Sequence, residues 1–330
     1  MANEIEKYNL LALADIEKIN GFADADIEKL NGFEFTGIVG FSVFYGGNPD
    51  ASGNTNVSNQ VNSSGVVASD SAGVGTARSG LNGTEYGGDK GIFFYGSAIG
   101  GNVTTRNLVA SNGIIASDQS GAGTTRHSAA AAGYSTNLGR CVMGETGSGK
   151  IGESNLINSS GVVGSDVTAV ADVKSGGGAT EYGGDKAIFA YGRDSSGLSN
   201  TRNLVSNSGV VASTASGAGS VRTFATACGF GDDQDEAIFV GGEGASGMTS
   251  VANKVSNSGV LTTDIIAVAT GRGYAAAMEF GGNKGIFAYG WVSGNVNTAN
   301  HIYAHGVVGS DITGVGLARN QPAGCGTGQS

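Results

Sequence analysis

One pattern of about 48 residues recurs along most of this chain, and this period constrains the fold more than any other feature. The fullest version runs from Arg78 to Gly123, and close copies begin at Lys174 and Arg272. A glycine followed by Val or Ile marks the register at intervals of 48, 48, 48, 50 and 47 residues: Gly65, Gly113, Gly161, Gly209, Gly259 and Gly306. Six repeats at one period predict a single repeat domain over residues 38–330.

Each repeat divides at its turn residues into four short β segments. In one repeat they are 78–86, 91–96, 107–110 and 114–117. The second segment, with Ile92-Phe93-Phe94, is apolar without alternation, which is typical of a strand covered on both faces. Across the repeats the first segments are rich in Gly, Ala and Ser, as in Ser128-Ala-Ala-Ala-Ala-Gly, which a crowded innermost strand requires. The sequence therefore predicts an all-β fold, a six-bladed β-propeller with four-stranded blades whose first strands line the axis.

The two ends of the repeat region complement each other. The first repeat begins at Gly40 in its second segment, and the last ends in an Arg319-led first segment with nothing after it. We expect that last segment to pair with residues 41–45, a one-plus-three closure that leaves no open sheet edge.

Residues 1–37 lie outside this register and carry three Ile-Glu-Lys-x-Asn motifs, spaced 11 residues apart. Each motif predicts either one short helical turn or, through its Asn-Gly, a short hairpin. Their apolar side chains need a surface to cover, so we expect an attachment or assembly arm that uses Ile5, Ile16, Ile19, Ile27 and Leu30.

Every repeat carries a basic residue and an asparagine in matching positions. The basic residues are Arg78, Arg126, Lys174, Arg222, Arg272 and Arg319. Our favoured interpretation is a structural ring that bridges neighbouring blades and pairs with the acidic column that precedes it: Asp70, Asp118, Asp166, Asp264 and Asp311, interrupted at Thr214. The alternative is an anion-binding ring at one mouth of the channel.

The net charge of −10 and the absence of a Lys/Arg cluster disfavour nucleic acid and anionic membranes as partners. No apolar run of 18 residues occurs, and the acidic N-terminal stretch does not look like a secretory signal. The sequence thus predicts a soluble protein made in a cytoplasm, without insertion into a membrane.

No catalytic or metal-binding signature stands out. His127, His301 and His305 lack metal spacing, and the scattered Cys141, Cys228 and Cys325 are interpreted as small buried side chains. The acidic insert at 232–236 lacks the ligand order of a calcium loop and is interpreted as a solvated turn. We therefore expect no cofactor and no metal.

The repeats differ most in the loops after their aromatic strands. These loops span residues 48–55, 97–104, 145–153, 193–200, 243–249 and 291–298. Variation confined to one set of loops on a repeated scaffold is typical of a recognition surface. Trp291 opens one of them, and Tyr95, Tyr191 and Tyr289 lie beside others. These four are the candidate ligand-binding residues for stacking on sugar rings, while rim packing is the alternative for the tyrosines.

The repeats resemble the kelch-repeat propellers. The resemblance rests on the basic residue before a Gly-rich strand and on Lys-x-Ile-Phe-x-Tyr-Gly strands ending in glycines, such as Phe44-Tyr45-Gly46-Gly47. It covers residues 38–326 and departs from the family where Val, Ile or Leu replaces the usual fourth-strand Trp. Some kelch-type enzymes resemble galactose oxidase, but a matching Tyr, Cys and His ligand set is absent here.

The Ile-Glu-Lys-x-Asn leader together with the Gly-Gly-Asp-Lys-x-Ile-Phe-x-Tyr-Gly blades also resembles uncharacterised propeller proteins of aquatic bacteriophages. That resemblance implies a non-enzymatic virion component, a tail or fibre protein for adsorption to the host, with surface glycan as ligand. Its arm would dock on other virion subunits in a homo-oligomeric assembly. The alternative is a self-assembling extracellular filament or surface-layer subunit, and a propeller enzyme ranks third.

Overall fold

The computed structural model describes residues 41–50, 53–168, 172–231 and 235–326, together with the backbone of four two-residue strands nearer the N-terminus. The chain divides into two units, Met1–Val39 and Gly40–Ser330. The described residues form strands, bridges and turns and contain no helix, so the predicted all-β class is confirmed. Among them, accordingly, no helix is long and apolar enough to cross a membrane.

In the first unit the described backbone forms two short antiparallel pairs. β1 (Lys18–Ile19) pairs with β2 (Phe22–Ala23), and β3 (Lys29–Leu30) pairs with β4 (Phe33–Glu34). Each pair flanks one Asn-Gly of the 11-residue motif, so the hairpin alternative holds at Ile19 and Leu30. Ile5, Ile16 and Ile27 lie outside the described residues.

In the second unit the described strands form six main antiparallel sheets, here numbered in chain order. Sheet 1 contains β28 (Ala323–Cys325), β5 (Ser42–Tyr45) and β6 (Ser58–Val61). Sheet 2 contains β8 (Asn82–Tyr86), β9 (Lys90–Phe94) and β12 (Arg106–Val109). Sheet 3 contains β13 (Ala130–Tyr134), β14 (Leu138–Thr146) and β15 (Gly149–Ile157).

Sheet 4 contains β16 (Gly178–Tyr182), β17 (Lys186–Asp194) and β18 (Gly197–Val205). Sheet 5 contains β19 (Thr226–Phe230), β20 (Glu236–Val240), β23 (Val251–Val255) and β24 (Ile265–Ile266). Sheet 6 contains β25 (Ala276–Phe280), β26 (Lys284–Ala288) and β27 (Ala299–Ile302). Smaller pairings join β7 (Arg78–Ser79), β10 (Ser97–Ala98) and β11 (Gly101–Asn102), and β21 (Glu243–Gly244) with β22 (Gly247–Met248).

The fourth segment of each repeat forms less regular strand than expected. Within the described residues only sheet 5 has a regular fourth strand, β24, and in other sheets the segment makes isolated bridges such as Val109↔Ile115 and Arg106↔Gln119. Between these two bridges the fourth segment advances by four residues, from Ile115 to Gln119, while the third strand advances by three, from Val109 to Arg106. The extra residue makes a β-bulge. The Asn107 side chain fills the gap, because its Nδ2 donates to the carbonyl of Ala116 at 3.0 Å.

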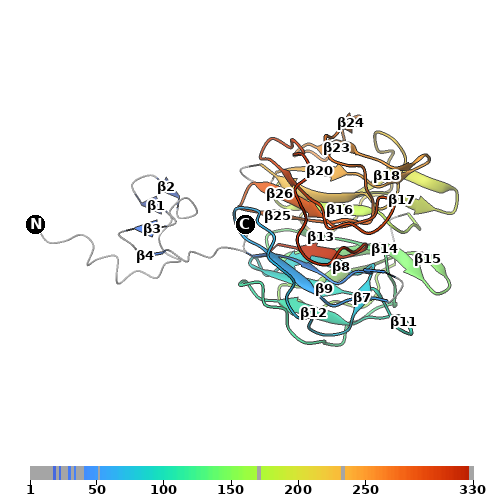
Figure 1. Ribbon diagram of the computed structural model, residues 1–330. Helices are drawn as coiled ribbons and strands as arrows, with labels where there is room; N and C mark the ends of the chain where they lie inside the picture. The colour runs from blue at the N-terminus through green and yellow to red at the C-terminus, as the bar shows by residue number, and fades with distance from the viewer. Residues whose placement is uncertain are drawn as a thin grey trace, which may run out of the picture. The chain divides into compact units, whose positions relative to one another are not determined.

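The core lies between sheets rather than within them. Each of six buried apolar clusters joins two neighbouring sheets, and one unites Phe44 and Val61 of sheet 1 with Phe280 and Ile286 of sheet 6. The labels of β8, β13 and β16 lie toward the middle of the unit, and those of β12, β15 and β24 lie toward its outside (Figure 1).

The chain's last described strand pairs with its first full strand. β28 is antiparallel to β5, with Ala323 opposite Tyr45 and Cys325 opposite Val43. β28 also packs beside both β25 and β8, so the first strands of sheets 1 to 6 neighbour one another in a closed order. The expected meeting of the two ends is therefore present as a strand pairing.

A closed cycle of backbone hydrogen bonds joins the entrances of the six first strands. Each donor N–H belongs to the second residue after a basic residue, and it donates to the equivalent carbonyl of the preceding sheet. The N···O distances lie between 2.7 and 3.3 Å for Gly80→Gln321, Ser128→Gly80, Gly176→Ser128, Phe224→Gly176, Tyr274→Phe224 and Gln321→Tyr274.

Aromatic side chains join the sheets at the opposite end of the strands. The register glycine of each repeat lies under a side chain from the preceding sheet; a Cβ at Gly209, for example, would lie 2.7 Å from the hydroxyl of Tyr134. Equivalent contacts pair Gly161 with Tyr86, Gly259 with Tyr182, Gly306 with Phe230, Gly65 with Phe280 and Gly113 with Phe41. This close approach explains why glycine recurs at the position.

Candidate functional site

The six basic residues are buried, with at most 2% of any side chain exposed. Arg78 represents them: its Nη2 donates to Oδ1 of Asn107 at 2.6 Å, and Nη1 lies 3.9 Å from Oδ1 of Asp118. Asp118 also accepts hydrogen bonds from Thr76 N–H and Oγ1, at 2.9 and 2.6 Å to its Oδ2. The network fastens the entry of a repeat to its own third and fourth segments.

The acidic partner differs from the predicted one. Arg78 pairs with Asp118, which follows it by about 40 residues, and not with Asp70, which precedes it. Asp70 instead accepts from Leu317 N–H at 3.0 Å, beside Arg319, so the network of sheet 1 joins the two ends of the repeat region. Arg126 and Arg272 likewise reach Asp166 and Asp311, at 3.6 and 3.8 Å.

Sheet 4 contains a rearranged version of this network. Lys174 replaces Arg, Thr214 replaces the acid, and Asp172 stands where four other repeats have Thr or Ser and the last has Leu317. Lys174 Nζ donates to Oγ1 of Thr201 at 3.1 Å, and this hydroxyl donates to Asp172 at 2.6 Å. Burial lowers the pKa of Lys174 to about 8, opposed by Asp172 and Asp194. The repeat that lacks an Asp in the acidic column, at Thr214, is thus the same repeat whose basic residue is Lys174.

Four of the five guanidinium groups also bridge neighbouring sheets by lying over aromatic rings, whereas Arg272 lies over Phe287 of its own sheet. Arg222 lies 3.7 Å from the ring centre of Tyr191, and Arg319 lies 3.8 Å from that of Tyr289, each ring belonging to the preceding sheet. Bridging between sheets was expected and is present, but through aromatic faces rather than carboxylates. Because these cations are buried and paired, they do not form an anion-binding ring open to solvent.

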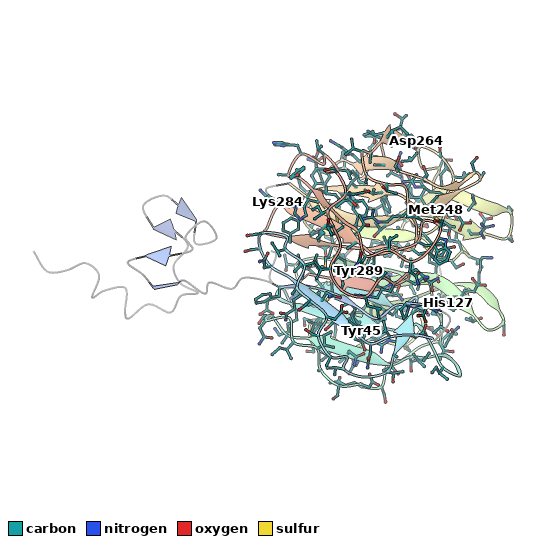
Figure 2. The ribbon with its side chains drawn as sticks, in the orientation of Figure 1. Tyr45, His127, Met248, Asp264, Lys284 and Tyr289 are labelled. Atoms are coloured by element: carbon teal, nitrogen blue, oxygen red, sulfur yellow. The ribbon has the colours of Figure 1, made fainter. Side chains whose placement is uncertain are left out.

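The three candidate tyrosines are part of this packing. Tyr95, Tyr191 and Tyr289 have no exposed surface, and their hydroxyls donate to the backbone carbonyls of Ala122, Ala218 and Val315. Figure 2 labels Tyr289 and its equivalent Tyr45 within the body of the unit. Positive φ angles between 58° and 65° turn all three inward. Their prediction as sugar-stacking residues is wrong for this conformation, and the packing alternative describes them.

Trp291 lies apart from these tyrosines, on the surface. It is 37% exposed, and its backbone forms a bridge with Gly273, next to Tyr274. It is thus the one member of the predicted set that a ligand can reach.

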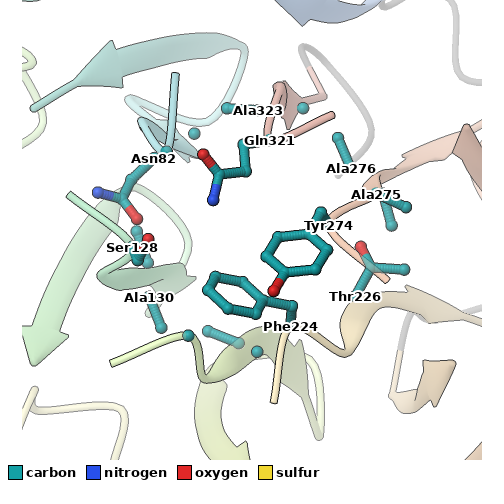
Figure 3. Close-up of a pocket in the computed structure, with 18 of the residues that line it drawn as sticks. Asn82, Ser128, Ala130, Phe224, Thr226, Tyr274, Ala275, Ala276, Gln321 and Ala323 are labelled. Carbon is teal, nitrogen blue, oxygen red and sulfur yellow. The ribbon is translucent and has the colours of Figure 1, made fainter. Parts of the chain in front are cut away.

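The loop-bearing end of the strands surrounds a cavity of about 140 Å³. Its walls come from the small-residue first segments of all six repeats. Figure 3 shows Phe224 and Tyr274 in the middle of this cavity, with the Gln321 side chain pointing toward them.

Phe224 and Tyr274 stack on each other, with ring centres 4.0 Å apart and an interplanar angle of 26°. The Tyr274 hydroxyl donates to Glu243 Oε2 at 2.8 Å, which fixes its ring. Both residues belong to the hydrogen-bonded cycle, whose geometry requires positive φ: 52° at Phe224 and 59° at Tyr274. For bulky residues this conformation costs about 1–3 kcal/mol each. Glycine occupies the same position at Gly80 and Gly176.

All six variable loops begin next to this cavity. The first residue of each loop pairs through its backbone with the residue after a basic one, as in Thr223↔Glu243. The remaining pairs are Ser97↔Ser79, His127↔Glu145, Ser175↔Arg193, Gly273↔Trp291 and Asn48↔Asn320. The loops that vary most in sequence therefore share one end of the molecule with the cavity mouth.

Deeper along the strands, a second cavity of about 60 Å³ is lined by three glutamates, Glu85, Glu181 and Glu279. At this position the repeats alternate glutamate with glycine: Glu85, Gly133, Glu181, Gly229, Glu279 and Gly326. The glycines make room, since a Cβ at Gly229 would lie 2.3 Å from Glu279 Oε1. Gly229 N–H donates to that oxygen at 2.7 Å.

Burial raises the pKa of all three carboxyl groups. For Glu85 the pKa reaches about 8, and the charge of Glu279 adds to the effect of burial. Among the residues that the structure describes, no three His, Cys, Asp or Glu side chains are arranged to hold a metal ion. The acidic insert lies partly outside those residues, at 232–234.

The described cysteines and histidines take structural positions. Cys141, Cys228 and Cys325 are buried free thiols, as expected for small core residues. His127 Nδ1 lies 2.9 Å from Ser128 Oγ, and His301 Nε2 lies 3.0 Å from the carbonyl of Gly65.

No protein-family model matches this chain, and no curated protein matches it. The kelch-like and phage-like resemblances therefore stay predictions, and the function has to be inferred from the site itself.

Sequence reasoning missed Phe224, Tyr274 and the alternating glutamates. The signal was available in the alignment of the repeats. The residues two positions after the basic residues are, in order, Gly, Ser, Gly, Phe, Tyr and Gln. The large Phe and Tyr stand out because the rest of this segment consists mainly of small residues.

Proposed function

We propose that residues 38–330 form a closed six-bladed β-propeller, a divergent kelch-like ring with one-plus-three closure. Support comes from three features that follow the same cyclic order: the hydrogen-bonded entrances, the apolar clusters between sheets, and the β28–β5 pairing. A propeller suits this sequence because full closure protects the edges of its short innermost strands.

We further propose that this propeller is a non-enzymatic recognition protein whose loop-bearing end binds a host-surface glycan. One observation carries the proposal: the six loops that vary between repeats all begin around the mouth of the axial cavity. Binding sites concentrate on loops positioned by a rigid scaffold, and concave mouths are their usual place.

The setting proposed for it is a phage virion, with the protein on a tail or fibre and residues 1–37 attached to other virion subunits. The paired strands around two Asn-Gly sites make the arm a set of repeated hairpins, which suits docking along a repeating partner.

The test uses single cysteines to block one end of the full-length protein at a time. Ser196→Cys lies in a variable loop and Ser64→Cys in a turn at the opposite end; both serines are exposed and the native cysteines are buried. After coupling to maleimide-polyethylene glycol, binding to aquatic bacteria and to arrays of bacterial surface polysaccharide is measured. Loss of binding at Ser196 alone is expected. Equal binding by both conjugates would overturn the proposal.

A specific observation favours the filament or surface-layer alternative. In every repeat the residue after the register glycine is an exposed aliphatic, between 45% and 65% accessible: Val66, Ile114, Val162, Val210, Val260 and Val307. In this alternative the arm of one subunit covers these side chains of the next, so a chain that begins at Gly37 should stay a soluble monomer, while the full-length protein should self-associate in sedimentation. A full-length protein that stays monomeric at high concentration would exclude this alternative.

A further inference from the structure

We propose that the mouth of the axial cavity is a binding site for one neutral pyranose, which stacks on the Phe224–Tyr274 pair and inserts a substituent into the cavity. The inference rests on the proposed recognition function and gives it a location and a ligand class.

The first argument is the cost of placing two aromatic rings there. All six positions of the hydrogen-bonded cycle have positive φ, between 51° and 66°. Gly80 and Gly176 meet that requirement without strain, whereas Phe224 and Tyr274 adopt a conformation that bulky residues avoid. Strained backbone of this kind clusters at ligand sites. The backbone gains nothing from these two rings, so their presence points to what the side chains contact.

The second argument is the position of the pair. Both rings are half-buried, and each has one face against the other, so part of the stacked pair stays open to solvent. The hydrogen bond from Tyr274 to Glu243 holds this platform in place. Figure 3 shows the rings among Asn82, Ser128 and Gln321, which come from three other strand entrances, and Thr226, which follows Phe224 on its own segment. An apolar face ringed by amides and hydroxyls is complementary to a sugar, which has C–H groups on its faces and hydroxyls at its rim.

A third observation is an unsatisfied polar group in the wall. Asn82 is 5% exposed, and within the described structure its Nδ2 has no hydrogen-bond partner. Buried polar atoms without partners are rare and costly in native proteins. Figure 3 draws this nitrogen pointing away from the stacked rings, so a ligand oxygen at the cavity would supply the missing acceptor once the amide group turns about its last side-chain bond.

Charge selects against an anionic ligand. No Lys or Arg lines the cavity. The six basic residues at the strand entrances are buried, and Glu243 and Glu145 start two of the surrounding loops, against one exposed base, Arg193, that starts a third. With a chain charge of −10, phosphorylated or carboxylated sugars and nucleotides are disfavoured relative to neutral pyranoses.

The size of the cavity sets how much of the ligand enters. Its volume of about 140 Å³ is under half of the roughly 300 Å³ at which pockets for whole small molecules begin. A hydroxymethyl or acetamido substituent fits, while the sugar ring stays at the platform. The site therefore suits a terminal residue of a glycan, with the rest of the chain among the variable loops.

The test compares the full-length protein with the variant Phe224→Gly/Tyr274→Gly. This variant has glycine at both positions, as two other repeats have at Gly80 and Gly176. Because glycine relieves the positive φ, the variant should fold with an unchanged or higher melting temperature. Ligands are the methyl pyranosides of glucose, galactose, mannose and N-acetylglucosamine, titrated by saturation-transfer NMR. We expect at least one to bind the native protein and to bind the variant at least tenfold more weakly. The exposed Tyr303→Ala, at the opposite end, should bind it unchanged.

Two results would overturn the inference. One is undiminished pyranoside binding by the folded double-glycine variant. The other is the absence of pyranoside binding by the native protein while it still binds bacterial polysaccharide through the Ser196 end, in which case the proposed recognition function stands and only its axial site is rejected. If polysaccharide and cells are not bound at all, both fail together.

Discussion

At the scale of single residues, the Arg–Asn–Asp network explains most of the recurrent polar positions of the repeats. A buried guanidinium needs partners for its charge and its donors. Each of the five arginines lies over an aromatic ring and near an Asp, and four of them donate to an Asn, while their Nε groups have no partner within the described structure. The repeat with Lys174 satisfies the same requirement by exchanging the positions of its acid and its hydroxyl, Asp172 and Thr214.

This exchange predicts strong coupling between positions 172 and 214. Thr214→Asp alone should destabilise the protein, because the new carboxylate faces Asp172 without a hydroxyl donor. Adding Asp172→Thr should recover the stability, since the pair then matches Thr76 and Asp118, which contact at 2.6 Å. We expect a coupling free energy on the order of 1–3 kcal/mol, measured by urea unfolding in a double-mutant cycle. Additive effects of the two changes would contradict this account.

The sequence could reveal these residues but not all of their contacts. Arg78, Arg126 and Arg272 each stand eight residues after one Asp of the column and about 40 before another, and the periodic sequence does not choose between the two for them. Similarly, Tyr95 and Trp291 both lie beside variable loops. Only the positive φ of Tyr95 shows that its ring turns into the core.

At the scale of strands and sheets, the second segments were predictable. The unbroken apolar run Ile92-Phe93-Phe94 falls within β9 and is buried, as expected for a strand covered on both faces. The fourth segments were not, because their pairing is interrupted where the side chain of Asn107 and its equivalents bonds to the opposite backbone. That bulge depends on a side-chain hydrogen bond, which the pattern of apolar and polar residues does not reveal.

Contact between sheets through the register glycine can be tested with two alanines. Gly209 and Gly247 both have positive φ, of 77° and 106°. Around Gly209 the buried ring of Tyr134 leaves no room for a Cβ, whereas nothing lies within 4 Å of one at Gly247. Gly247→Ala should cost about 1 kcal/mol through backbone strain alone, and Gly209→Ala about 2–4 kcal/mol once overpacking is added. Similar losses in thermal unfolding would argue against this packing.

At the scale of the whole molecule, three sheets contribute carboxyl groups to one narrow cavity. Their raised pKa values mean that the folded protein holds protons that the unfolded chain releases. The stabilisation is therefore complete below the unfolded pKa near 4.5, and it is lost as pH rises toward about 8, the folded pKa of Glu85.

Stability should consequently fall between pH 5 and pH 8. Glu85→Gln should be close to neutral at the acid end and stabilising on the order of 2 kcal/mol at the alkaline end, because it removes the group that must ionise in the cavity. Melting temperatures across this range provide the measurement, with the exposed Glu236→Gln as control. A Glu85→Gln profile parallel to that of the native protein would show that these carboxyls do not titrate as described.

The closed ring is the claim on which the cavity, its mouth and the recognition face all depend. Asn48 and Asn320 provide its most direct test, because their backbones exchange hydrogen bonds of 2.8 and 3.0 Å across the junction of the two chain ends. Asn48→Cys/Asn320→Cys should form an intramolecular disulfide on mild oxidation, seen by non-reducing electrophoresis and peptide mass spectrometry. Asn48→Cys/Ser175→Cys, which joins equivalent positions of sheets 1 and 4, should not. Failure of the first pair to link within one chain, or linkage only between chains, would contradict closure.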